Sequence, residues 1–274
     1  MRRRTYYLLG GLAFIATLIA FAPASLLGRA LSKTSDIALY RNQGSLWVGH
    51  GQLDYRNQPL GELSWRFEPS SLLHLNVGFH LELNAPAHHF SGSLIRSLKS
   101  TELLGDAVIR QASMDQILRA YDISAPGEIL VKNLQLKFPD ASGDSDTTDE
   151  SASTEDRSGP AVRLPWITGE VHWSGGLVRY RLSGHDFQKQ LPPIVGYIET
   201  DNGIPEMTTY LDTAQASDPV SSGTQDTPLI LARLDNQGWL TLGITRAFTE
   251  LAGQPWPGSE PSHAVVLEVQ EKVF

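Results

Sequence analysis

The most apolar part of the chain is residues 5–28, which contain no charged side chain and follow the basic run Arg2–Arg4. A helix of that length is about 36 Å long, enough to cross a bilayer core of about 30 Å with some tilt. Basic residues favour the cytoplasmic side of a membrane. The pattern therefore predicts a cytoplasmic tail over residues 1–4, a single transmembrane helix over residues 5–28 and the rest of the chain outside the cytoplasm.

A cleaved signal peptide is the alternative to a retained anchor. Ala20-Phe21-Ala22 has the small-x-small form of a cleavage site, and Ala22-Pro23-Ala24 is a second candidate. Proline directly after the cut is unfavourable, and the apolar run is longer than the roughly 7–15 residues of a signal core. We therefore predict that the segment is retained, while both alternatives export the remainder.

Beyond the anchor, apolar and polar residues alternate with a period of two, which is the pattern of half-buried strands. In residues 62–68, Leu63, Trp65 and Phe67 share one face, and the charged and hydroxyl side chains share the other. Residues 74–84 alternate in the same way and place five apolar side chains on one face: Leu75, Val77, Phe79, Leu81 and Leu83.

Repeated strands at short intervals indicate an antiparallel sheet. A Gly175-Gly176 pair between two strand-like runs predicts a hairpin. Two short helices are predicted at residues 113–121 and 245–252, the first from apolar side chains at helical spacing behind Ser113. The fold class is therefore mainly β, an antiparallel curved sheet or sandwich. Further strands are predicted at residues 37–40, 90–94, 103–109, 128–138, 167–173, 177–184, 229–234, 239–244 and 264–269.

Residues 139–160 interrupt the strand pattern with a run of acidic and small polar residues. Such a run cannot bury enough apolar surface to offset the entropy of ordering, so we predict a disordered acidic linker. It separates a first β-rich half, residues 29–138, from a second, residues 161–274. The motif Gly-Glu-apolar-x-Trp occurs once in each half, at residues 61–65 and 169–173.

Composition narrows the chemistry. The chain has no cysteine, which excludes thiolate nucleophiles, cysteine-bound zinc and iron–sulfur clusters. Its net charge of −8 at pH 7 lacks the basic footprint that nucleic acid binding needs. We therefore expect no nucleic acid partner.

No catalytic motif stands out. The adjacent pair His88-His89 points to opposite faces of a strand unless it lies in a turn, and neither an HExxH nor a GxSxG motif is present. No glycine-rich phosphate loop precedes a helix. We therefore predict no catalytic, cofactor-binding or metal-binding residue, no cofactor and no enzymatic activity. An envelope enzyme acting on glycans stays open as a rival, because paired carboxylates cannot be excluded from a chain rich in acids.

A set of short segments, taken in order, resembles the type II secretion system protein N family. The resemblance implies a bitopic inner-membrane protein of a Gram-negative envelope, whose periplasmic β domain binds other secretion components as an accessory subunit without catalysis. The strand pattern is also similar to AsmA-like envelope proteins, which implies a curved sheet that binds or transfers lipid on an apolar concave side. Neither resemblance identifies the partner-binding residues. The segments are Gly44–Gly49, Leu63–Trp65 followed by Pro69 and Leu72, Val171–Gly176, Gly238-Trp239 and Leu251–Trp256.

Overall fold

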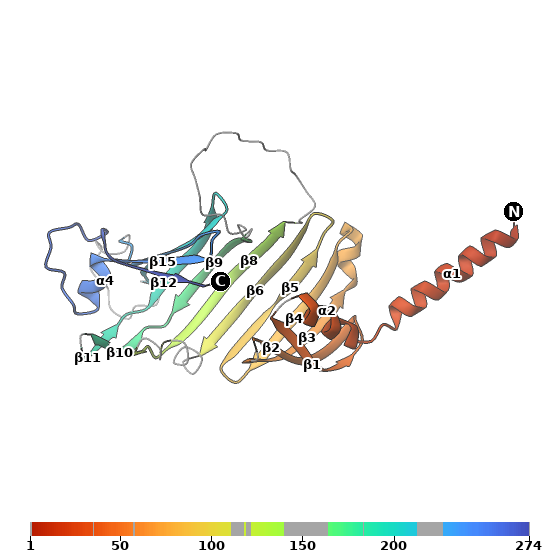
Figure 1. Cartoon of the computed structure of the whole chain (residues 1–274), viewed down its shortest axis with the longest axis horizontal. Coiled ribbons are helices and arrows are strands. Elements are labelled where there is room, and N and C mark those ends of the chain that lie inside the picture. Colours follow the sequence, from red (N-terminus) through yellow and green to blue (C-terminus); the bar gives the residue numbers. More distant parts are fainter. Residues whose placement is uncertain are drawn as a thin grey trace. The chain divides into compact units, whose positions relative to one another are not determined.

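The computed structural model forms two compact units, Met1–Ile95 and Arg96–Phe274 (Figure 1). Both are built mainly from antiparallel strands, as predicted. The structure describes residues 2–34, 36–56, 58–110, 118, 122–139, 164–182, 184–212 and 227–273.

The first unit consists of two helices followed by a sheet with strand order β1-β2-β3-β4-β5. Leu63 pairs with Leu83 and Trp65 with Leu81, so the predicted apolar faces of β3 and β4 coincide. Leu75 is the exception, because β4 begins at Val77 and Leu75 lies in the turn before it. The elements are α1 (Arg2–Ala20), α2 (Ser25–Thr34), β1 (Ile37–Gly44), β2 (Val48–Tyr55), β3 (Gln58–Glu68), the 3-10 helix η1 (Pro69–His74), β4 (Val77–Ala85) and β5 (His88–Arg96).

The predicted helix over residues 5–28 is not continuous. α1 ends at Ala20, and α2 begins at Ser25 after a short turn. Pro23 has no backbone N–H and disfavours the helical conformation at Ala22, so the helix stops there. Over the described parts of the chain, no helix is both long enough and apolar enough for a membrane crossing, and the predicted span is not confirmed.

The core of the first unit lies between α2 and the sheet, where α2 rests against β1 (Figure 1). Ala24, Leu39 and Trp65 are buried together there, with Ala24 only 1% exposed. The helix therefore covers the apolar face that the alternating pattern creates. The side chains packed around these three are Leu27, Leu31, Leu53, Leu63, Phe79 and Leu81.

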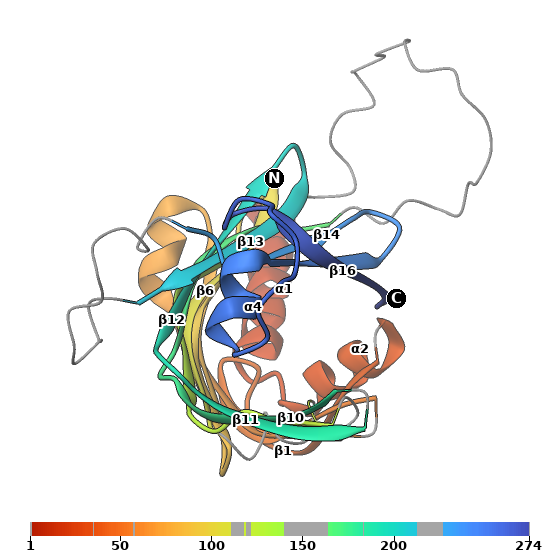
Figure 2. The same ribbon diagram turned by 90° about the vertical axis from the view of Figure 1, so that its left-hand side faces the viewer.

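The second unit holds a larger antiparallel sheet, ordered β6-β8-β9-β12-β13-β14-β15-β16, and a small sheet, ordered β11-β10-β7. Figure 2 shows that its strands follow a curve, with α4 on the inner side. The elements are β6 (Ser100–Arg110), β7 (Ile123–Ser124), β8 (Glu128–Pro139), β9 (Trp166–Trp173), β10 (Gly176–Leu182), β11 (His185–Leu191), β12 (Ile194–Asp201), β13 (Ile204–Leu211), β14 (Ile230–Leu234), β15 (Trp239–Thr245), α4 (Arg246–Leu251) and β16 (Val265–Lys272).

The hairpin predicted at Gly175-Gly176 is wrong. β9 pairs on one side with β8 and on the other with β12, so neither edge is left for β10, which joins the small sheet instead. Both glycines have positive φ angles, 75° and 154°. A Cβ atom at Gly175 would lie 2.7 Å from the carbonyl oxygen of Leu191, so this corner between sheets requires glycine.

The helix predicted at residues 245–252 is confirmed by α4. The Thr245 hydroxyl accepts a hydrogen bond from the Phe248 N–H, as an N-cap does. The predicted linker lies outside the described residues except for Pro139, which ends β8. The predicted helix at residues 113–121 also lies outside them, apart from Leu118, which is helical. β8 and β9, on either side of the linker, pair directly.

Candidate functional site

The end of α1 is hydrogen-bonded to the turn between β1 and β2. The Trp47 indole N–H donates to the carbonyl oxygen of Ile19 at 2.9 Å. The backbone N–H of Leu46 donates to the carbonyl oxygen of Ala22 at 2.8 Å. The Ile19 carbonyl oxygen also accepts from the Ala22 N–H at 3.2 Å, so the indole adds a second donor at the end of α1.

The segment between α1 and α2 is also hydrogen-bonded to the end of β1 and the turn after it. The Ala24 N–H donates to the carbonyl oxygen of Gly44, and Pro23 forms a bridge with Ser45. Ala22 and Ala24 are both buried. Proteases act on exposed, extended segments. Both cleavage sites considered from the sequence therefore lie in a folded junction, which we call the helix–sheet junction.

An aromatic row leads from this junction onto two strands, β3 and β4. The Trp47 ring meets the Phe67 ring edge-on at 4.8 Å between centroids, and Phe67 meets Phe79 at 5.6 Å. Trp47, which the sequence places in a corner beside glycine, therefore links the end of α1 to the sheet. The signal that could have identified this role is the Gly44–Gly49 turn, whose tight geometry brings Trp47 back over the sheet edge.

A second feature is an apolar face on the larger sheet of the second unit. Cross-strand partners continue the face from strand to strand, since Val131 pairs with Val171 and Ala232 with Leu242. None of the seven side chains that define it is buried, and Val269 is 52% exposed. We call this set the apolar face: Val131, Val171, Ile198, Met207, Ala232, Leu242 and Val269.

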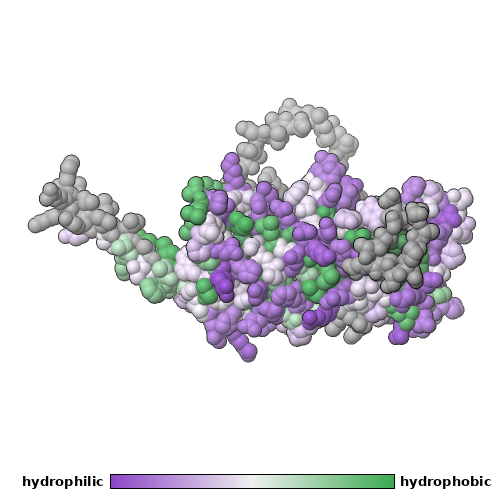
Figure 3. All heavy atoms as spheres, turned by 180° about the vertical axis from the view of Figure 1, so that it is seen from behind, coloured by the Kyte–Doolittle hydropathy of each residue, from purple (hydrophilic) through white to green (hydrophobic). Residues whose placement is uncertain are grey.

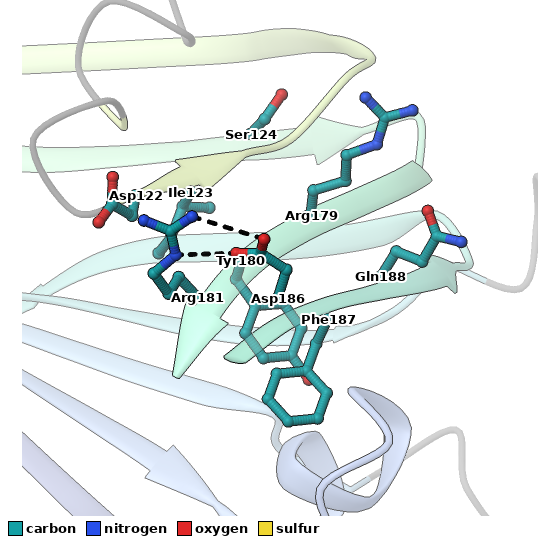
Figure 4. A pocket seen from close by; sticks show the side chains of 9 residues that line it. All are labelled: Asp122, Ile123, Ser124, Arg179, Tyr180, Arg181, Asp186, Phe187 and Gln188. Carbon is teal, nitrogen blue, oxygen red and sulfur yellow. Dashed lines mark hydrogen bonds and ion pairs between the residues drawn. The ribbon is translucent and has the colours of Figure 1, made fainter. Parts of the chain in front are cut away.

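An open hollow of about 630 Å³ lies on the small sheet (Figure 4). Arg181 donates to the Asp186 carboxylate at 2.8 Å, and this hydrogen bond lowers the pKa of Asp186. The two charges neutralise each other at the surface. Tyr180 and Phe187 stack beside them, and the Tyr180 hydroxyl donates to the carbonyl oxygen of Ala252. A second aspartate, Asp122, also lines the hollow and interacts electrostatically with Arg181.

Two carboxylates contact the imidazole of His172 in the second unit. Its Nδ1 lies 2.9 Å from an Asp212 carboxylate oxygen and its Nε2 lies 3.4 Å from a Glu170 carboxylate oxygen. Both ring nitrogens are therefore engaged by carboxylates. Asp212 is buried, so this contact joins the end of β13 to the polar face of β9. Sequence reasoning missed the cluster because its members are far apart in the chain.

The histidine pair His88-His89 points to different partners. A His88 ring nitrogen donates to the carbonyl oxygen of Leu60, whereas Nδ1 of His89 lies 2.7 Å from the Asn84 side-chain oxygen. In the described part of the chain, no three histidine, aspartate or glutamate side chains are placed to hold a metal ion.

Comparison with known protein families gives one match. The model of the family described as type II secretion system protein N matches residues 36–194, which is more than half of the chain. The matched region begins directly after α2 and runs through the first unit to the start of β12. No curated protein and no solved structure matches.

Proposed function

The chain belongs to the type II secretion system protein N family, and from that premise we propose that it is a non-enzymatic accessory subunit of this secretion system. α1 holds it in the inner membrane with the N-terminus in the cytoplasm, and both units bind other secretion components in the periplasm. The observation that carries the proposal is the family match over residues 36–194. The resemblance seen in the sequence rests on segments within and beyond this region.

The anchoring role of α1 is supported by its side chains. Phe14, Ile15, Leu18 and Ile19 are exposed, as lipid-facing residues would be (Figure 3). The 19 residues of α1 correspond to about 28 Å of helix, close to the thickness of a bilayer core. Arg2–Arg4 at its start favour the cytoplasmic side.

The helix–sheet junction supports retention of the anchor. A cut after Ala22 or Ala24 would remove the carbonyl partners of Trp47 and Leu46 and break the chain inside the fold. We expect the protein in isolated envelopes to have the full mass of 30.1 kDa. Intact-mass spectrometry of the membrane fraction measures this. A mature N-terminus at Pro23 or Ser25 would end the tethered mechanism.

Partner binding is tested by co-purification from mild detergent with the tag at the C-terminus. We expect other type II secretion components to be recovered with the full chain. Trp47→Ala, which removes the donor to Ile19 and the contact with Phe67, should reduce the recovery because the sheet of the first unit is no longer held at the end of α1. Trp239→Ala, an exposed tryptophan in the second unit, is the matched control. Recovery of no secretion component with the intact chain would refute the proposal.

The apolar face favours a second candidate function, the binding of a lipid acyl chain. Seven strands contribute to the face, and none of its defining side chains is buried. Mass spectrometry of the purified full chain tests this through bound phospholipid. Ile198→Glu, on the face, should abolish the bound lipid, whereas Tyr197→Glu places the same charge on the opposite side of β12 and should not. Equal lipid content in both variants would exclude the face as the site.

A further inference from the structure

We infer that the first unit has a second membrane contact, a loop of exposed leucines that inserts into the surface of the bilayer beside α1. The loop follows β3 and includes η1. Its tip side chains lie largely in solvent, with Leu73 85% and Leu75 81% exposed. Exposed apolar clusters of this kind mark interaction surfaces. We call Leu72, Leu73, Leu75 and Val77 the leucine loop; this inference rests on the proposed anchoring of α1.

The loop is held rigidly in this conformation. The Ser71 hydroxyl donates to the Glu68 carbonyl oxygen at 2.6 Å and accepts from the Gly78 N–H at 2.8 Å, which closes the base of the loop. The N–H groups of Leu75 and Asn76 donate back to the carbonyl oxygens of Leu72 and Ser71. Leucines in a fixed loop cannot turn inward to join the core, so their exposure is a property of the fold.

Leu75 is the C-cap residue of η1. Its φ angle is 58°, in the left-handed region that commonly closes a helix C-terminus. Asparagine also adopts this region readily. The cap fixes the direction in which the chain leaves the loop.

The loop lies at the end of the sheet from which α1 departs. Val48 pairs with Arg66 and Glu68 pairs with Gly78, so the turn after β1 and the loop after β3 are at the same end. Neighbouring strands are about 4.8 Å apart, which puts the loop at β4 about 10 Å from β2 along the sheet. The aromatic row from Trp47 to Phe79 spans this interval. Figure 3 shows hydrophobic residues gathered where α1 leaves the first unit.

Charge favours lipid over a basic or acidic protein surface. No aspartate or glutamate occurs between Glu68 and Glu82, although the chain carries a net charge of −8. An anionic bilayer surface therefore does not repel the loop. Leucine side chains at the boundary between headgroups and acyl chains bind through apolar area. With α1 as the first attachment, insertion of the leucine loop gives two points of contact and fixes how the first unit faces the membrane.

The test places a single environment-sensitive fluorophore on the loop, which is straightforward because the chain has no cysteine. Leu73→Cys in the full chain carries the label, and Glu62→Cys, an exposed position near the opposite end of the same sheet, is the matched control. Both are reconstituted in phosphatidylethanolamine–phosphatidylglycerol vesicles with spin-labelled lipids. We expect a blue shift and quenching at position 73, and neither at position 62.

A second variant shows whether the leucines cause the insertion. The label is moved to Leu72→Cys, and Leu73→Gln with Leu75→Asn removes the apolar tip while asparagine keeps the positive φ angle. We expect loss of the quenching at position 72 and an unfolding midpoint that is not lowered. Quenching that persists in this variant would overturn the inference.

Two outcomes separate the loop from the anchor. If alkaline carbonate extracts the full chain from the vesicles, the premise that α1 anchors the protein fails. If the chain stays in the membrane while the label at position 73 remains in water, the anchor stands and the leucine loop is not a lipid contact. A label that is exposed to water in lipid vesicles but protected from water in native envelopes would likewise overturn the inference, since a protein would then cover the loop.

Discussion

Both units contain the motif Gly-Glu-apolar-x-Trp, but the two tryptophans that end it lie in different environments. Trp65 on β3 is 4% exposed beneath α2, whereas Trp173 on β9 is half-buried. The local contacts are alike, since each indole N–H donates to a backbone carbonyl oxygen, that of Ser45 at 3.2 Å and that of Pro126 at 3.1 Å. The burial of the tryptophan therefore does not follow from the strand, its alternating pattern or this hydrogen bond.

The difference comes from what lies on each apolar face. In the first unit, Leu27 and Leu31 of α2 pack onto the sheet and turn its face into a core. In the second unit, the side chains of the apolar face are half-buried across seven strands, except the exposed Val269. One alternating pattern thus produces a core where a helix covers it and a half-buried face where no described helix does.

Replacing each of the two tryptophans should give the largest difference in stability between the two units. Trp65→Ala should lower the free energy of unfolding by about 3–5 kcal/mol, the usual cost of removing a buried aromatic side chain. Trp173→Ala should cost about half as much, because Trp173 is only half-buried and loses less packing. Denaturant unfolding of the full chain in detergent measures both. Equal losses would show that the two faces are covered to the same degree.

A polar contact on the opposite side of its sheet also stabilises the second unit. Asp212→Ala should cost about 3 kcal/mol, because the buried carboxylate contacts His172 and its removal leaves the imidazole without that partner. Asp212→Asn keeps a hydrogen-bonding oxygen in place and should cost less. The same unfolding experiment distinguishes them, and equal losses would mean that the volume of the side chain matters rather than the contact.

A pair of glycines sharpens the comparison. A Cβ atom at Gly49 would lie 2.6 Å from the Trp65 ring, so Gly49→Ala should cost about 2 kcal/mol through overpacking. A Cβ atom at Gly196, beside Val171 on the apolar face, would lie 3.2 Å from the Thr209 methyl group, and Gly196→Ala should cost less. If Gly196→Ala cost more, the apolar face would be as tightly packed as the core of the first unit.

The smallest expected effect is the pH dependence at Glu102. Its hydrogen bond to Lys137, at 2.9 Å, lowers the pKa of the carboxyl group. A lowered pKa stabilises the fold above the ordinary glutamate value, and this contribution is lost as the pH falls through the lowered value. The pair is partly exposed, so Glu102→Gln should reduce the loss between pH 7 and pH 3 by at most about 0.5 kcal/mol. Unfolding midpoints at the two pH values test this, and a larger loss in the variant would reverse the sign.

Much of the second unit follows from local signals. The strands predicted at residues 229–234 and 239–244 are confirmed by β14 and β15, and the helix predicted at residues 245–252 is confirmed by α4. Such features depend on residues within a few positions of one another, so the sequence predicts them. The alternation of β3 is predicted for the same reason.

The sites are different, because each joins distant residues. The helix–sheet junction needs Trp47 to reach Ile19, and the cluster around His172 needs Asp212, 40 positions away. The alternation of apolar and polar residues does not predict contacts between residues so far apart in the chain. The failed hairpin at Gly175-Gly176 has the same origin, since the edge of β9 that it required is occupied by β12.

The sequence by itself determined the strands, their apolar sides, the turns between them and the position of Pro23, because backbone preferences and alternation act over a few residues. The tertiary structure decided which strand β9 pairs with and which apolar face is covered. Alternation makes a face apolar but does not specify what packs on it. That choice depends on whether another element, such as α2, reaches the face, and the answer separates the core of the first unit from the half-buried face of the second.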